Sequence, residues 1–401
     1  MTSKIEELLQ KYCPDGVEFE ELWKVLDYEQ PTKYLVSSTN YDNSYNTPVL
    51  TAWQTFILWY TNEENSIYQA SNENAVIIFD DFTTAFKWVD FPFKAKSSAM
   101  KMLTSKNLQE YNLRFIYYAM RRIRYSTLDH ARQWISSYSK IQIPIPPLPV
   151  QEEIVKILDT FTELEAELEA ELEARKQQYE YYRDWIFFIN WEFQEQSLEE
   201  IIISLKTGLN PRKNFVLNTK DAKNYYVTVR ELGGLNINFF DKTDKVNDKA
   251  LKLIKNRSNL EIGDVLFSGT GTIGRTALVK ENPYNWNIKE GVYVIKPNIE
   301  KVDSKFLLYF LNSSQAKRQI ENKIVGSPVS SIPMSELRKL KIPIPYKNWQ
   351  PDLERQKEIV AILDKFDALT NDISIGLPAE ITARRQQYEY YREKLLNFKP
   401  L

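Results

Sequence analysis

Ile143-Pro-Ile-Pro146, Glu153-Ile-Val-x-Ile-Leu-Asp-x-Phe-x-x-Leu164 and Arg175-x-Gln-Gln-Tyr-Glu-Tyr-Tyr-Arg183 follow one another in the middle of the chain. The same motifs return in the same order near its end, as Ile342-Pro-Ile-Pro345, Glu358-Ile-Val-x-Ile-Leu-Asp-x-Phe-x-x-Leu369 and Arg384-x-Gln-Gln-Tyr-Glu-Tyr-Tyr-Arg392. Each copy closes a half of roughly 200 residues, which is far longer than a solenoid repeat. The sequence therefore indicates a duplication of a whole domain together with a helix.

The segments that precede the two copies share almost no readable sequence. We therefore expect variable domains over residues 1–142 and 190–341, with conserved helical regions over residues 143–189 and 342–401. Conserved helical regions that alternate with two different variable domains suit a molecule that holds two chemically different surfaces at a fixed separation. An enzyme with one active site has little use for such an arrangement.

The composition favours a soluble, cytoplasmic protein. The 401 residues include no apolar run near the ~20 residues of a membrane span, and the first residues do not resemble a secretory leader. The single cysteine, Cys13, excludes an internal disulfide. The length predicts two to four domains, with enough material for two cores.

The net charge of -2 hides a segregation of charge. Residues 76–140 carry eleven basic residues against five acidic ones, and residues 206–257 carry twelve against five. Two basic segments in an acidic chain are suited to the capture of phosphate backbone, although ordinary solvated surfaces explain them about equally well. Aromatic residues crowd the first half among Ser, Thr, Asn and Gln, a mixture that can supply base-edge contacts, although most aromatic residues belong to cores.

We predict that residues in and around these segments, and residues of the later part of the second half, contact DNA. In the first half they are Ser37, Ser38, Thr51, Trp53, Gln54, Lys87, Lys94, Lys96, Lys101, Arg121, Arg122 and Arg124. In the second half they are Lys206, Thr207, Arg212, Lys213, Arg230, Thr270, Thr272, Arg275 and Ser327.

Apolar residues at three- and four-residue spacing predict long helices in both repeated regions. The first helix runs from Gln151 to about Phe187, and the second breaks at Gly376-Leu-Pro378. We expect the two to pack as an antiparallel, coiled-coil-like pair between the variable domains rather than as part of one helical bundle. The residues predicted for spacing and subunit docking are Ile154, Ile157, Phe161, Leu164, Leu168, Leu172, Tyr179, Tyr182, Ile359, Ile362, Phe366, Leu369, Tyr388 and Tyr391.

The sequence pattern of each variable half predicts an α+β domain. Short β-branched and aromatic runs at 76–79, 225–229, 264–267, 276–279 and 291–295 predict strands, and stretches at 113–123 and 304–320 predict helices. Gly269-Thr-Gly271-Thr-Ile-Gly274 matches the dinucleotide fingerprint, but a β-like segment follows where that fingerprint needs a helix. A strand, glycine-rich turn and strand are therefore predicted, and the glycines allow a close backbone approach.

Catalytic constellations are scarce. His130 is the only histidine, which excludes a two-histidine zinc site. Asp80-Asp81 could hold a metal in principle, but no Glu-x-Lys nuclease signature accompanies it. Asn282-Pro283-Tyr284 lacks the second proline of the amino-methyltransferase signature, and no cofactor motif precedes it.

Across essentially its whole length the chain resembles specificity subunits of type I restriction-modification systems. The resemblance rests on the two repeated blocks, the Leu-Glu-Ala-Glu repeats over 164–174, the opening Tyr12-Cys-Pro-Asp-Gly-Val17 and the segment Gly263 to Arg275. In place of the Gly-Thr-Ile-Gly turn the first half has Asp80-Asp-Phe-Thr-Thr84, so residues cannot be transferred between the halves one by one.

The resemblance implies a fold of two target-recognition domains, each reading one part of a split, asymmetric DNA site. It implies that the chain is not catalytic and binds no cofactor itself. Two modification subunits would supply the S-adenosylmethionine chemistry, and restriction subunits would supply Mg- and ATP-dependent translocation and cleavage. The alternatives are a self-contained DNA methyltransferase, a nucleotide-binding oxidoreductase, and a coiled-coil scaffold that does not bind DNA.

Overall fold

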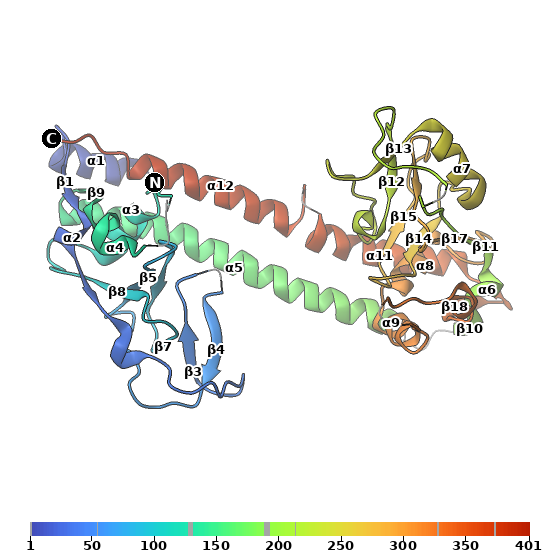
Figure 1. Ribbon diagram of the computed structural model, residues 1–401, viewed down its shortest axis with the longest axis horizontal. Helices are drawn as coiled ribbons and strands as arrows, with labels where there is room; N and C mark the ends of the chain where they lie inside the picture. Colours follow the sequence, from blue (N-terminus) through green and yellow to red (C-terminus); the bar gives the residue numbers. More distant parts are fainter. Residues whose placement is uncertain are drawn as a thin grey trace. The chain divides into compact units, whose positions relative to one another are not determined.

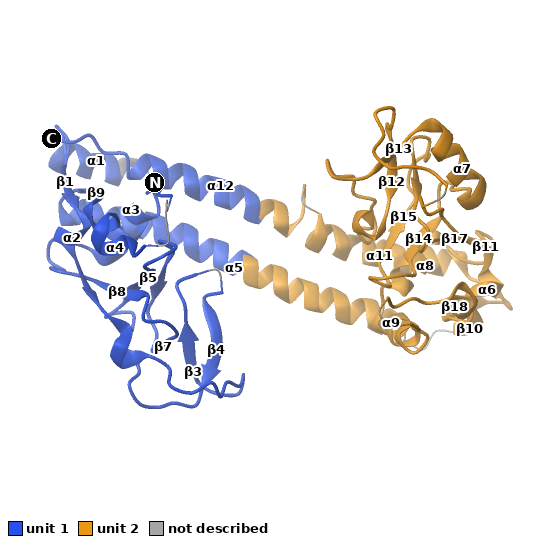
Figure 2. Cartoon of the chain, in the orientation of Figure 1, with its two compact units in different colours: residues 1–168, 381–401 blue, residues 169–380 orange. Residues whose placement is uncertain are grey.

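The computed structural model describes residues 2–53, 55–126, 131–187, 193–212, 214–326, 329–372 and 374–401. The chain divides into two compact units, one formed by residues 1–168 with 381–401 and the other by residues 169–380 (Figure 2). Each unit holds one of the variable segments and parts of the repeated helices. The chain therefore returns to its first unit after completing its second.

The first unit contains a sheet of antiparallel strands in the order β2–β8–β5–β6, of which β8 and β5 are labelled in Figure 1. These strands are β2 (Leu26–Glu29), β8 (Met100–Ser105), β5 (Val76–Asp80) and β6 (Phe86–Val89). In a second sheet, β3 (Thr47–Leu50) is antiparallel to β4 (Ile57–Thr61) and parallel to β7 (Lys94–Ala95). The first Ile-Pro-Ile-Pro motif lies largely in β9 (Gln142–Ile145), which pairs with β1 (Glu18–Glu21).

The second unit repeats this plan. Its antiparallel sheet has the order β11–β17–β14–β15, formed by β11 (Ile202–Thr207), β17 (Val292–Pro297), β14 (Val265–Ser268) and β15 (Thr276–Leu278). β12 (Asn224–Val227) is antiparallel to β13 (Lys245–Val246) and parallel to β16 (Trp286–Ile288). The second motif lies in β18 (Lys341–Lys347), between β10 (Phe193–Ser197) and β19 (Gln350–Pro351).

The duplication therefore includes the variable halves, although their sequences hide it. Both units have the same strand order, the same mixture of parallel and antiparallel pairs, and a turn at the same place between equivalent strands. That turn joins β5 to β6 in the first unit and β14 to β15 in the second. Different side chains can occupy one topology as long as the core-facing positions stay apolar.

Equivalent helices follow the two sheets, α3 (Leu113–Met120) and α8 (Ser304–Leu311). Asn112 caps α3 by accepting hydrogen bonds from two backbone N–H groups, and Asp303 caps α8 in the same way. A buried glutamine at the start of each long helix secures these caps. Gln151 Oε1 accepts from the Asn112 N–H at 2.9 Å, and Gln356 Oε1 accepts from the Asp303 N–H at 2.8 Å.

The first long helix, α5, runs without interruption from Leu148 to Ile186. Its 39 residues span about 58 Å at 1.5 Å per residue. The second repeated region forms α11 (Leu353–Asn371) and α12 (Leu377–Leu395), and this confirms the predicted break. A Cβ on Gly376 would lie 2.4 Å from the carbonyl oxygen of Ala368, so only glycine fits there.

Contacts within the first unit show an antiparallel pairing of α5 with α12. The ring of Phe161 stacks on Tyr391 with centroids 5.2 Å apart, and Glu165 pairs with Arg385 at 2.5 Å. Within the second unit, Tyr179 and Tyr182 stack on Phe366 of α11. The aromatic residues of the repeated motifs therefore form much of the helix seam.

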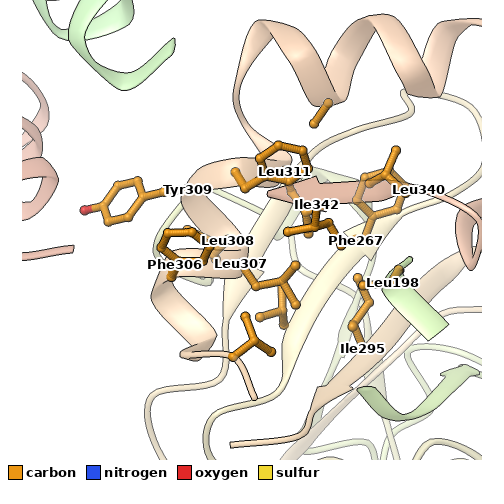
Figure 3. Packing of buried hydrophobic residues seen from close by; sticks show 14 of the residues in the cluster. Leu198, Phe267, Ile295, Phe306, Leu307, Leu308, Tyr309, Leu311, Leu340 and Ile342 are labelled. Atoms are coloured by element: carbon orange, nitrogen blue, oxygen red, sulfur yellow. The ribbon is translucent and has the colours of Figure 1, made fainter. Parts of the chain in front are cut away.

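Each unit has its own core. In the second unit, side chains of α8 lie against Phe267 and Ile295 of the sheet, while Tyr309 points away from them (Figure 3). The main core of the first unit joins α3 and β5 to α5 and to Tyr388 and Leu396 near the C-terminus. The N-terminal and C-terminal segments also meet, because the Val17 N–H donates to Lys399 O at 2.9 Å.

The remaining helices are short. They are α1 (Thr2–Tyr12), α2 (Leu22–Val25), α4 (Gln133–Ser136), α6 (Leu198–Ile201), α7 (Asp248–Ser258), α9 (Ser314–Glu321) and α10 (Met334–Leu337), with 3-10 turns at Pro31–Tyr34, Tyr138–Lys140 and Val229–Glu231. Among the helices of the described residues, none has the length and apolar character that a membrane crossing requires.

The predicted strands are confirmed, as is the strand, turn and strand arrangement around the glycines. Residues 269–275 connect β14 to β15 with no helix between them, so the resemblance to a dinucleotide fingerprint carries no structural meaning. The single helix predicted over 304–320 is wrong. It is divided into α8 and α9 because Ser313 leaves the helical path and caps the Ala316 N–H.

Candidate nucleic-acid interface

An exposed aromatic and basic surface lies on the smaller sheet of the first unit. Trp59 of β4 is 52% exposed and stacks nearly parallel to Tyr41, with an interplanar angle of 6° and centroids 6.3 Å apart. Lys96 donates from Nζ to the Tyr41 hydroxyl at 2.9 Å. Trp53, also exposed, lies in the loop between β3 and β4. Flat rings beside an available ammonium group suit contact with nucleotides.

The predicted polar residues around this surface support its loops. Thr51 donates to Thr55 O at 2.9 Å and accepts from the Trp53 N–H at 3.3 Å, so it shapes the loop that presents Trp53. The backbone N–H groups of Ser37 and Ser38 donate to Glu63 at 2.9 and 2.7 Å. Gln54 lies outside the described residues.

Two predicted lysines are buried and must be removed from the DNA-contacting set. Lys94 is 2% exposed and pairs with Glu63 at 2.6 Å. Burial would raise the pKa of Glu63, but the Lys94 ammonium group and the two serine N–H groups hold that pKa below its usual value. Lys101 is fully buried and lies 3.2 Å from the equally buried Asp81. Both lysines pair with a carboxylate inside the fold, because a buried lysine requires a partner, and neither ammonium group can reach DNA.

The neighbouring predicted basic residues have different surroundings. Lys87 in β6 is half-buried. Arg122 is half-buried. It donates to Asn397 at 2.8 Å, pairs with Glu393 at 3.1 Å and donates to Leu396 O, so it holds the C-terminal segment in the first unit. Arg121 lies over the rings of Tyr117 and Tyr388 and is exposed, as Arg124 is. Arg121 and Arg124 are therefore better placed than Arg122 to meet phosphate.

In the second unit, the glycine-rich turn forms the candidate surface. Thr270, Thr272 and Arg275 are exposed on it. The backbone anchors the turn, because the Gly269 N–H donates to Gly291 O at 2.7 Å and the Gly271 N–H donates to Ser330 O at 2.9 Å. A Cβ on residue 269 would overlap the Tyr293 ring at 2.1 Å, which explains the glycine.

Arg275 connects this turn to a second basic residue. Its guanidinium lies 3.5 Å from Val229 O, next to Arg230 in the chain. Arg230 is itself exposed and makes long ion pairs with Asp244 at 3.4 Å and Glu231 at 3.7 Å. Two arginines on adjacent loops, one of them only weakly paired, form a basic edge that can approach phosphate or guanine.

The other predicted residues of the second unit also divide into exposed and buried ones. Lys206 and Arg212 are exposed. Thr207 is buried, and its hydroxyl donates to Val292 O and accepts from the Gly291 N–H, both at 3.1 Å, so its role is structural. Lys213 and Ser327 lie outside the described residues, as does His130.

The carboxylates offer no metal centre in the part of the chain that the structure describes, where no cluster of three potential ligands is found. Asp80 accepts hydrogen bonds from the Phe82 and Thr83 N–H groups at 3.1 and 2.8 Å, so it caps the β5–β6 turn. Asp81 forms the buried ion pair with Lys101.

The predicted helix residues separate into buried and outward-facing ones. Six of them are buried: Ile154, Ile157, Phe161, Tyr179, Ile359 and Tyr388. Phe366, Tyr182 and Tyr391 complete the stacks, and Leu168 and Leu172 are half-buried. Ile362, Leu164 and Leu369 are between 37% and 43% exposed, so they lie outside the buried seam, and their part in subunit docking stays a prediction. Leu158 and Leu363, four residues after Ile154 and Ile359, take the inward position because the helix repeats every 3.6 residues.

The prediction missed a pair of equivalent tyrosines. Tyr181 and Tyr390 hold the same place in the two repeated motifs and are 64% and 61% exposed. The repeat contained the signal, because an identical aromatic residue stood in both copies at a position outside the apolar stripe. Trp59 and Tyr41 were also missed, since the sequence did not show which aromatic residues of the first half face solvent.

Comparison with known proteins agrees with this architecture. The family model described as the type I restriction modification DNA specificity domain matches residues 14–174 and again residues 190–383. The chain is 41% identical over 99% of its length, and 97% of the relative's, to the specificity subunit of the type I restriction enzyme EcoR124I/EcoR124II from Escherichia coli. It is 31% identical to a putative type I specificity subunit from Haemophilus influenzae over 86% of both chains.

Solved structures share the fold at low sequence identity. The type I restriction-modification S subunit from M. genitalium superimposes with a TM-score of 0.56 over 96% of this chain and 97% of that chain, at 14% identity. A chain from a structure on complex assembly and conformational transition of the type I system gives a TM-score of 0.58 over 96% of this chain and 98% of that chain, at 15% identity.

Proposed function

The chain belongs to the family of type I restriction-modification DNA specificity domains, and we propose that its two units read the two parts of one split, asymmetric DNA site. It is a DNA-recognition specificity subunit. The observation that carries the proposal is the pairing of one strand topology with two different surfaces. Trp59 and Lys96 face solvent beside the half-buried Tyr41 in the first unit, whereas Arg230, Arg275 and the glycine-rich turn face solvent in the second.

The two surfaces imply different kinds of contact. Trp53 and Trp59 offer apolar faces of the kind that meet thymine methyl groups or sugars, and Lys96 supplies a charge for phosphate. Arg275 has the planar donor arrangement that recognises guanine, provided that it leaves its long contact with Val229 O. The first unit is therefore the more dependent on shape and apolar contact, and the second on hydrogen bonds.

The repeated helices provide two equivalent places for a partner. Each copy has one strongly exposed tyrosine, Tyr181 at 64% or Tyr390 at 61%, in the same motif as tyrosines that stack on another helix of the chain. Two copies of one modification subunit would bind these places, and restriction subunits would join that complex. S-adenosylmethionine, ATP and Mg²⁺ then belong to the partners, and this chain binds none of them. In the complex it is cytoplasmic and associated with the nucleoid.

The experiment that tests this function begins by sequencing methylated adenines in the host, which yields the split motif. A duplex containing that motif is then bound by the chain with its modification subunits, and binding is measured by fluorescence anisotropy. We expect Trp59→Ala to weaken binding by about tenfold, since one good base contact contributes on the order of 1–3 kcal/mol. Trp23→Ala is the matched control, because Trp23 is 48% exposed in the same unit but outside the candidate surface.

A second set of measurements separates a specificity subunit from a self-contained enzyme and from a scaffold that does not bind DNA. Calorimetry of the isolated chain with S-adenosylmethionine, and separately with NAD, should show no binding heat. Binding of either cofactor would support a self-contained enzyme and contradict the proposal. Equal affinity for the motif and for a scrambled duplex would exclude sequence recognition, and loss of all DNA binding at moderate salt would favour a scaffold.

A further inference from the structure

The second repeated region contains a short insertion that the first one lacks. Four residues separate Pro146 from Gln151, whereas ten separate Pro345 from Gln356, although the motifs on either side are shared. The additional residues extend β18 and form β19, which makes a hairpin. The two repeated regions therefore differ at this hairpin, although they are otherwise similar. The difference lies in a conserved region and not in a variable half.

The turn of the hairpin is strained. Lys347 pairs with Gln350, so Asn348 and Trp349 form a two-residue loop. Both have positive φ, 51° and 65°, as a type I′ turn requires. Asparagine tolerates this region and glycine is usual at the second position, but tryptophan is an unfavourable choice there.

The fold gains nothing visible in return for the strain. Trp349 is 90% exposed, the most exposed of the large apolar side chains in the described residues. A conformation that costs energy and places a large ring in solvent points to a role outside the folded chain. Tryptophan is also the residue type most often found to dominate binding at protein interfaces.

We propose that Trp349 is a one-sided anchor for a modification subunit, which makes the two subunit sites unequal. The inference rests on the proposed function, in which the repeated frame receives two copies of that partner. The hairpin lies in the second unit, as Tyr181 does, and has no equivalent in the first. The modification subunit bound at the second unit therefore gains a contact that the other copy lacks.

The charges around the hairpin favour a protein partner over DNA. Residues 341–358 contain four basic and three acidic side chains. Several of these pair locally, as Lys357 does with Glu354 at 2.8 Å. Phosphate capture needs a net basic surface, and this mixed surface does not provide one. An aromatic residue surrounded by mixed charges resembles the centre and rim of a protein interface.

The test combines Trp349→Gly with binding of the modification subunit from the same host. The full chain is titrated with that subunit, and the two binding steps are resolved by calorimetry and native mass spectrometry. The unaltered chain should bind two copies with different affinities. Trp349→Gly should weaken the tighter step at least tenfold, so that the two steps become similar, while the chain melts at the same or a higher temperature because glycine suits the turn.

Two controls keep the result specific. Asn348→Gly changes the same turn but keeps the tryptophan, so both binding steps should stay as in the unaltered chain. Tyr284→Ala removes another exposed aromatic side chain of the second unit, 69% exposed, and should leave both steps unchanged.

Several outcomes would overturn the inference. If Trp349→Gly binds both copies as the unaltered chain does, the hairpin is not a subunit contact. If it weakens only DNA binding, the tryptophan belongs to the DNA interface, and if it abolishes self-association of the chain, the partner is a second copy. If the unaltered chain binds DNA but no modification subunit, the partner proposal fails together with this one.

Discussion

The length of α5 predicts the spacing of the DNA site. The segment Leu164 to Ala174 repeats Leu-Glu-Ala-Glu, and α5 passes through it without a break. One further unit after Glu171 adds four residues, about 6 Å of helix at 1.5 Å per residue. Since base pairs stack about 3.4 Å apart, the unread gap between the two parts of the site should lengthen by roughly one to two base pairs.

The helix should tolerate this insertion. Four residues turn the helix by about 40° beyond one full turn at 3.6 residues per turn, so the apolar stripe stays nearly in line. Leu168 and Leu172, the residues next to the insertion, are only half-buried and leave room for adjustment. The bases read on either side of the gap should not change, because no residue of either variable half is altered.

The assay is adenine-methylome sequencing of a host that carries the insertion. The matched control inserts Gly-Ser-Gly-Ser at the same point, which adds the same number of residues but breaks the helix. We expect a uniquely lengthened gap for the helical insertion, and loss of modification or mixed gaps for the control. An unchanged gap with the helical insertion would show that α5 does not set the spacing.

Three further predictions concern stability and phosphate contacts. Lys101→Met should destabilise the first unit by about 3–5 kcal/mol in urea unfolding, because Asp81 would remain buried without its partner; a loss below 1 kcal/mol would contradict that pairing. Arg124→Ala should reduce the salt-dependence slope of DNA binding by about one, whereas Arg122→Ala should lower the melting temperature and leave the slope unchanged; the reverse pattern would exchange their assigned roles. Burial and the hydrogen bond to Asp364 raise the pKa of Tyr309, so the folded state keeps a proton that the unfolded chain releases above about pH 10. Stability should therefore fall with rising pH above that value and fall less steeply in Tyr309→Phe, and equal slopes in urea unfolding between pH 8 and 11 would contradict this.

The sequence was sufficient to predict the duplication, the long helices and the strand-rich halves. Those features depend on local rules. Ile154, Leu158 and Phe161 recur at helical spacing, and Gly376 and Pro378 lie where the second repeated region breaks into two helices. The glycine-rich turn could also be interpreted correctly, since the residues after Gly274 are β-like.

The surface residues were harder to predict because burial depends on contacts distant in sequence. Lys101 and Lys94 look like surface lysines, and only the fold places Asp81 and Glu63 beside them. Arg122 belongs to a basic run, but the C-terminal segment that it holds is more than 270 positions away. The common topology of the two variable halves was likewise hidden, because β3 and β12 share no readable sequence.

A domain exchange tests whether each unit reads its own part of the site. Residues 1–142 are replaced by the equivalent segment of a relative with a known target, and the methylated motif is sequenced in a host that expresses the hybrid with its modification subunits. If each unit reads its own part, one part of the motif changes to that of the relative, while the other part and the gap stay as they were. A motif that changes in both parts at once would contradict it.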